Sequence, residues 1–401
     1  MSRCPRKTSR QSNSSLRAPV RVRFALLIGL LIGVLLFGSG PADAQSDWQL
    51  LSQQTSARFS QSLDVSLRVR ASEPIEDVIL FYGRAGDRIV RRIYPPFGRG
   101  VELNLDYRES LERGQFAPGT ELRTWWRLTD ASGDTFETPV QSILYTDEAH
   151  DWRMLEGDTA RLFYYDVRES KASGWLDEAE STLERIRREI GLSPERIVDI
   201  YVYRNETDMR AAVAMRSDDY DARVTTLGVA VDEDTLILLG SQANLELTMA
   251  HELSHIVVGM ATDNPYAGLP RWLDEGLAMI AEGELPRQNA LALERAIAND
   301  DLLSVRSMTS YSGRADQVDL YYGECHSVVS FLIDSYGRDR LNALLARFAE
   351  GTSQHSALES VYGFDIEELD ALWRESLGLD RRSQTLSNHG TAGTLAARAF
   401  G

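Results

Sequence analysis

The apolar residues of this 401-residue chain change their spacing partway along it. Between about residue 46 and residue 147, apolar and polar residues alternate in short runs, as at 63–69 and 101–107, with turns of Gly, Pro, Asp and Ser between them. About seven such runs in about 100 residues predict a β-sandwich of immunoglobulin or fibronectin-III type. From about residue 243 onward the apolar residues recur at helical spacing. Strands first and helices after predict an α+β chain.

A second group of strands is expected between the sandwich and the helices. Residues 162–165 and 197–203 are predicted strands, 175–190 a helix that ends at Gly191, and 224–239 a hairpin with its turn at 232–234. The helices that follow are expected at about 243–261, 270–283, 287–299, 316–336, 338–349 and 365–377. We therefore divide the chain into a leader (1–44), a β-sandwich (45–150), a domain of a small mixed sheet plus helices (151–380) and a disordered tail (381–401).

Positive charge is concentrated at the start of the chain. Seven basic residues precede an apolar run at 24–37, and Ala42-Asp43-Ala44 then has the small-x-small spacing of a signal cleavage site. The run is shorter than the roughly 20 residues of a spanning helix, which favours a cleaved secretory signal. Extended through residue 42 it leaves an uncleaved anchor as the alternative, with membrane association through 24–42. Both alternatives predict an extracytoplasmic protein, either secreted or held at the cell envelope.

Charge and cysteine usage exclude several classes of protein. The chain has 43 Lys and Arg against 60 Asp and Glu, a net charge of −17. Its two lysines, Lys7 and Lys171, do not follow a Gly-rich turn, so a P-loop is excluded. No folded segment has a concentrated basic face, so we expect no nucleic-acid binding. Cys4 lies in the leader, which leaves Cys325 alone and predicts no intrachain disulfide. The sequence does not indicate an oligomeric state.

One motif carries the chemistry of a metal site. His251-Glu252-Leu253-Ser254-His255 is an H-E-x-x-H segment in a predicted helix. Positions i and i+4 share one face of a helix, so both imidazoles can reach one metal ion. The remaining faces are apolar and suit burial in a core, where unpaired imidazoles are costly. A structural pair of core histidines is the alternative.

A second segment favours the metal site. Glu275, within Pro270-Arg271-Trp272-Leu273-Asp274-Glu275-Gly276, stands 20 positions after His255. That separation allows a loop and a second helix to bring the carboxylate to the same metal. Two His and one Glu leave a fourth position open for water, as in catalytic rather than structural zinc sites. The predicted cofactor is one Zn²⁺ per chain.

The two segments together resemble a known family. H-E-x-x-H followed by W-L-x-E-G-x-A is similar to the gluzincin metallopeptidases, above all to the exported bacterial peptidase MA-like family, which is related to thermolysin and the zinc aminopeptidases. The resemblance covers about residues 155–378 and implies a gluzincin fold for this part of the chain. It implies zinc ligation by His251, His255 and Glu275, and Glu252 as the general base.

Two positions depart from the related families. Met279 stands where the thermolysin-like pattern has an Asp that orients a zinc histidine, which leaves the partner of that histidine unassigned. Residues 227–231, Leu-Gly-Val-Ala-Val, lack the Glu of the aminopeptidase G-x-M-E-N segment, which grips a free amine. Aminopeptidase activity is therefore not part of the prediction, and both endopeptidase and exopeptidase activity stay open. An extended peptide could instead pair with the backbone of this edge strand.

The resemblance extends to a helix that begins near Tyr321 and Tyr322 and ends at Gly337. In the related families a Tyr near the start of this helix faces the carbonyl that is attacked. Counting back from Gly337 favours Tyr322, because Tyr321 would point about 100° away around the helix. The alternative is that both tyrosines only pack in the core.

The predicted function is that of an exported zinc metallopeptidase with peptide or protein substrates. Two other functions stay open. One is a non-catalytic zinc-binding envelope or surface protein that uses its β-sandwich for binding. The other is a zinc hydrolase of non-peptide amides.

Overall fold

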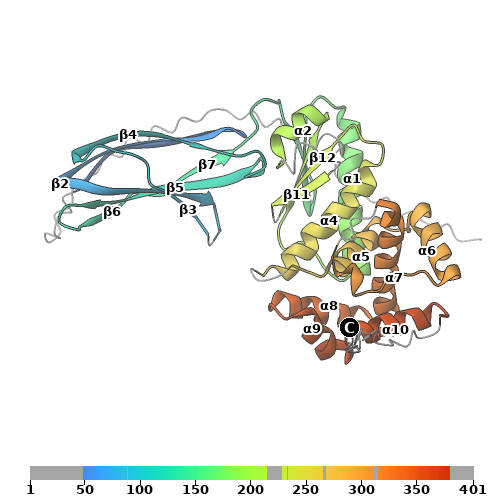
Figure 1. Ribbon diagram of the computed structural model, residues 1–401. Helices are drawn as coiled ribbons and strands as arrows, with labels where there is room; N and C mark the ends of the chain where they lie inside the picture. The colour runs from blue at the N-terminus through green and yellow to red at the C-terminus, as the bar shows by residue number, and fades with distance from the viewer. Residues whose placement is uncertain are drawn as a thin grey trace, which may run out of the picture. The chain divides into compact units, whose positions relative to one another are not determined.

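The computed structural model describes residues 48–87, 89–214, 228–232, 234–264, 268–310 and 315–379 (Figure 1). They form two compact units. The first holds the described residues up to Arg187 together with Ser193–Met260, and the second holds Arg188–Leu192 and the described residues from Ala261 on. The predicted leader and tail lie outside the described residues. None of the helices in the described ranges has the length and apolar character needed to cross a membrane.

The first unit begins with an antiparallel β region. Its strands are β1 (Gln49–Arg58), β2 (Ser62–Arg84), β3 (Arg91–Ile93), β4 (Gly100–Ser110), β5 (Thr120–Asp130), β6 (Thr135–Glu137) and β7 (Gln141–Tyr145). The 23-residue strand β2 connects the whole region. Its first half pairs with β1 and β4 and its second half with β3 and β5, with a shift of register between Arg70 and Ile75.

The two halves of β2 face one core. Alternate residues point inward, as the period of two in the sequence predicts. The core cluster contains Leu63, Val65 and Leu67 from the first half, Val78, Leu80 and Tyr82 from the second half, and Leu105 and Trp126 from the neighbouring strands. The predicted N-terminal β region is therefore confirmed. Its strands form a single seven-stranded hydrogen-bonded network, which short runs of alternation could not predict.

A five-stranded mixed sheet follows in the same unit. It consists of β8 (Arg153–Glu156), β9 (Ala160–Tyr164), β10 (Val198–Tyr203), β11 (Gly228–Asp232) and β12 (Thr235–Leu239), in the order β11-β12-β10-β9-β8. Strands β9, β10 and β12 are parallel, whereas β11 runs antiparallel to β12 at one edge. The crossover from β9 to β10 is α1 (Glu169–Glu189). The predicted small sheet is confirmed. Of the hairpin predicted at 224–239, the described strands β11 and β12 pair as expected, and residues 224–227 and 233 lie outside the described residues.

The antiparallel β region contacts this sheet next to its edge strand. Arg84 of β2 donates from Nη2 to Oδ1 of Asp234, in the turn between β11 and β12, at 2.9 Å. Only 17% of the Arg84 side chain and 23% of the Asp234 side chain are exposed, so the pair is less solvated than most ion pairs on the surface.

The helix α4 (Leu245–Thr262) contains the H-E-x-x-H motif. Eight of its apolar side chains are buried, among them Met249, Leu253, Ile256 and Val257. A helix that is apolar on most faces is stable only when it is surrounded by other elements. The motif therefore lies on a buried helix, as its flanking residues predict.

The second unit is helical. It contains α5 (Arg271–Glu282), α6 (Arg287–Asn299), α7 (Val318–Tyr336), α8 (Arg338–Ala349), α9 (Gln354–Tyr362) and α10 (Ile366–Ser376), with short 3-10 helices at Ser307–Thr309 and Ala315–Gln317. All the helices that we predicted here are present. Sequence reasoning missed α9 and, in the first unit, the seven-residue α2 (Glu206–Ala212). Each is short and begins at a side-chain cap, Ser353 for α9 and Asn205 for α2.

The helices α5 and α7 pack against each other at Gly276. A Cβ atom added to this glycine would lie 2.5 Å from the carbonyl oxygen of Cys325 and would also overlap the side chain of Val329. The backbone of α5 therefore approaches α7 more closely than any other residue type would allow. Because Glu275 directly precedes Gly276, the close approach of α5 to α7 also determines where the Glu275 carboxylate lies.

We expect Gly276→Ala to destabilise the protein. Alanine in place of glycine at an open helix position stabilises by about 1 kcal/mol, but overlap with the backbone of α7 should cost about 1–3 kcal/mol. The matched control is Gly174→Ala in α1, where an added Cβ meets nothing within 4 Å. Urea denaturation should show a lower midpoint for Gly276→Ala and a raised midpoint for Gly174→Ala. A raised midpoint in both variants would contradict the proposed close packing.

Candidate metal centre

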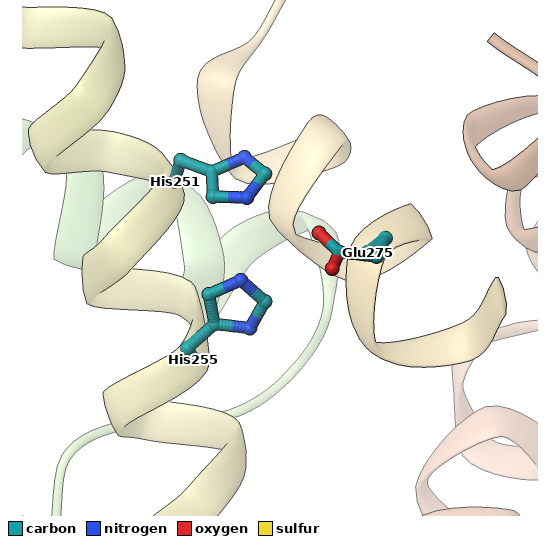
Figure 2. Close-up of side chains that lie close together, drawn as sticks. All are labelled: His251, His255 and Glu275. Carbon is teal, nitrogen blue, oxygen red and sulfur yellow. The ribbon is translucent and has the colours of Figure 1, made fainter. Parts of the chain in front are cut away.

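The helix α4 brings His251 and His255 together on one face. Their ring centroids lie 4.9 Å apart, with the ring planes inclined at 77°. Figure 2 shows the two imidazoles one turn apart on α4, both directed toward Glu275. The i and i+4 positions of the motif thus lie side by side, as the helical period requires.

Glu275 of α5 completes the group. One ligand atom from each of His251, His255 and Glu275 lies within 4.8 Å of the others. Glu275 is only 3% exposed, and an ionised carboxylate buried to this degree needs a positively charged partner. Two imidazole nitrogens and one carboxylate oxygen form the donor set of a catalytic zinc site with an open position. The chemistry and the spacing of these side chains fit a zinc ion.

Glu275 also contacts Arg271, which the sequence analysis did not single out. Nη2 of Arg271 lies 2.6 Å from Oε1 of Glu275, one helical turn away on α5. Burial lowers the pKa of Arg271, but the Glu275 carboxylate and the Tyr321 phenol raise it above its ordinary value. The signal in the sequence is the i, i+4 spacing of Arg271 and Glu275 within the second motif.

Glu252 follows His251 on α4 and is partly buried. It is one residue from one histidine and three from the other, so it stands about 100° around the helix from His251. Its role as a general base stays a prediction.

The two tyrosines near the start of α7 differ in their surroundings. Tyr321 is 2% exposed and its hydroxyl donates to the carbonyl of Met308 at 3.3 Å. Burial raises the pKa of Tyr321. Tyr322 is partly exposed, and its ring meets that of Tyr321 edge to face. The predicted end of this helix at Gly337 is confirmed, with φ of +84°. The role of Tyr322 stays a prediction.

Three other features of the sequence are Met279, Cys325 and the predicted edge strand. Met279 is 3% exposed, so the position of the thermolysin-like Asp lies in the apolar interior. Cys325 is a buried free thiol, and burial raises its pKa. The predicted edge strand is β11, of which residues 228–232 are described and Leu227 is not.

Comparison with known proteins identifies the family. The model of the Peptidase MA superfamily matches residues 178–378, which include α4, α5 and α7. A search of the curated proteins gives no match. An M1 zinc metallopeptidase from Deinococcus radiodurans is 16% identical, with a TM-score of 0.38 over 83% of this chain and 95% of that chain. An aminopeptidase N family protein from Idiomarina loihiensis is 10% identical, with a TM-score of 0.30 over 80% of this chain and 70% of that chain.

The metal-ligand group and the family match define a zinc metallopeptidase of the gluzincin type. The chain belongs to the Peptidase MA superfamily. The family resemblance seen in the two sequence motifs is therefore confirmed.

We expect His251→Ala, His255→Ala and Glu275→Ala each to weaken zinc binding. The loss should exceed the roughly 10–100-fold that is typical for removal of a group that only supports a ligand. The matched control is His355→Ala, because the His355 side chain is 63% exposed on α9. Chelator competition measures the affinity, and a chelator should also lower the melting temperature of the wild type. Wild-type affinity in all three ligand variants would refute this site.

Proposed function

We propose that the protein is an exported zinc peptidase that hydrolyses peptide bonds, with one zinc ion per chain and Glu252 as the general base. The convergence of His251, His255 and Glu275 supports this proposal most directly. The peptide substrate is inferred from the family. Export is proposed from the leader pattern at residues 1–44 alone.

Three side chains would hold the metal. Zinc bound by His251, His255 and Glu275 supplies a Lewis acid that activates water near neutral pH. Three protein ligands would leave room at the metal for water and substrate. The ligand set thus suits hydrolysis rather than a purely structural role.

Glu252 would move the proton. Its carboxylate accepts a proton from the attacking water and then passes that proton to the leaving amine. Glu252 is next to His251 on α4, and the helix keeps the direction of Glu252 constant relative to both histidines. This position beside the metal ligands suits a general base.

Two further elements would orient the substrate. The outer edge of β11 presents backbone N–H and C=O groups with which an extended peptide can pair. The hydroxyl of Tyr322 would donate a hydrogen bond to the oxyanion that develops on the attacked carbonyl. Tyr321 is less suited to this role, since its hydroxyl already donates to the carbonyl of Met308.

We expect Glu252→Gln to keep zinc and to lose peptide cleavage, because an amide cannot accept the proton. The substrate is a mixture of unstructured proteins, and mass spectrometry identifies the new chain termini. The matched control is Glu246→Gln, in the exposed first turn of the same helix. Undiminished cleavage by the Glu252 variant would assign the base to another group. Zinc binding by the wild type without any cleavage would favour a non-catalytic function.

We expect Tyr322→Phe to keep the fold and the zinc while turnover falls by about 10²-fold or more, the scale for losing one oxyanion donor. Tyr321→Phe should change turnover little. Steady-state kinetics on a peptide found in the cleavage experiment measures both variants. Equal turnover of wild type and Tyr322→Phe would remove Tyr322 from the mechanism. A larger loss in Tyr321→Phe would shift the role by one residue.

A further inference from the structure

The contact between Arg271 and Glu275 spans one turn of α5. Arg271 is the first residue of the helix, and its Nη2 lies 2.6 Å from Oε1 of Glu275. The Arg271 side chain is 48% exposed, whereas that of Glu275 is 4% exposed. The ion pair therefore connects the surface of the second unit with the buried carboxylate that belongs to the metal-ligand group.

A contribution to the stability of α5 does not explain the ion pair between Arg271 and Glu275. A cation in the first turn faces the positive end of the helix dipole, which is the unfavourable end for a positive charge. A base that precedes an acid by four residues is also the less stabilising order for such a pair. In addition, α5 begins at Pro270 and has no side-chain cap to offset the unfavourable position of this positive charge. Arg271 is thus poorly placed to stabilise α5 but well placed to contact Glu275.

Tyr321 of α7 lies near Arg271. Tyr321 is itself almost fully buried and is tied to the carbonyl of Met308. The planar guanidinium of Arg271 donates to Glu275 in a defined direction, which the flexible ammonium group of a lysine would not do.

We propose that Arg271 is a positioning residue for the metal centre. It engages Oε1 of Glu275 and so turns the carboxylate to present Oε2 to the metal as a single-oxygen ligand. In this role Arg271 acts through Glu275 and is not itself a metal ligand. The proposal rests on the metal centre of the proposed peptidase, and it can be tested without a substrate.

The test compares Arg271→Met with Arg271→Lys in the full chain. Arg271→Met keeps much of the length and apolar stem but removes charge and donors, and it should weaken zinc binding by about 10–100-fold. It should also change the visible absorption spectrum of the cobalt(II)-substituted protein, which reports the geometry of the ligands. Arg271→Lys keeps a charged donor and should recover part of the affinity and of the spectrum.

The matched control is Arg210→Met. Arg210 forms an ion pair with Glu206 at the same distance of 2.6 Å and the same i, i+4 spacing, on the helix α2. This variant should have the zinc affinity and the cobalt spectrum of the wild type. The melting temperature of the metal-free protein should be close to the wild-type value in Arg210→Met, whose ion pair is exposed, and in Arg271→Lys, which keeps a positive charge beside Glu275. It should fall in Arg271→Met, because the buried Glu275 carboxylate then loses its charged partner.

Two results would overturn the proposal. The first is wild-type zinc affinity together with a wild-type cobalt spectrum in Arg271→Met. The second is an equal loss of affinity in Arg271→Met and Arg271→Lys with a lowered metal-free melting temperature in both, which would indicate a purely structural role. Since the affinity and the spectrum are measured without substrate, either result is distinct from a failure of the protein to cleave peptides.

Discussion

The burial of one carboxylate is the constraint on which the rest of the site depends. Glu275 is 3% exposed on a helix whose other buried residues are mostly apolar, so its negative charge must be compensated nearby. Two imidazoles alone do not supply that compensation when they are neutral. A divalent cation bound jointly by the three side chains does, and Arg271 adds a second positive group. The close packing of α5 on α7 at Gly276 then leaves the carboxylate little freedom to move toward solvent.

The antiparallel β region is joined to the part of the fold that is proposed to bind substrate. Its strand β2 reaches the turn between β11 and β12 through the ion pair of Arg84 and Asp234. That turn follows β11 directly, and β11 is the strand whose outer edge an extended peptide would use. The β region thus directly contacts the turn that follows this edge strand.

The metal ligands could be predicted from the sequence, because the helical period and the spacing between the two motifs are local properties of a chain. His251, His255 and Glu275 could therefore be assigned, and the structure brings them together. The long helices and the small sheet were predictable for the same reason. Short elements such as α2 and α9 were not, since caps and tertiary contacts rather than periodicity define them. Arg271 was missed because its position at the start of α5 has meaning only once the burial of Glu275 is known.

Met279 and Arg271 lie one turn to either side of Glu275 on α5. Residues four before and four after Glu275 lie on the same face of α5, one turn to each side of the ligand. In the thermolysin-like pattern the polar supporting residue follows the ligand by one turn, and it orients a histidine. Here that turn carries Met279, which is 3% exposed and packs in the interior, while the turn before carries Arg271. On this face of α5 a charged residue thus precedes the ligand by one turn, and an apolar residue follows it by one turn. In the role proposed for Arg271, the charged residue orients the carboxylate of Glu275 rather than a histidine.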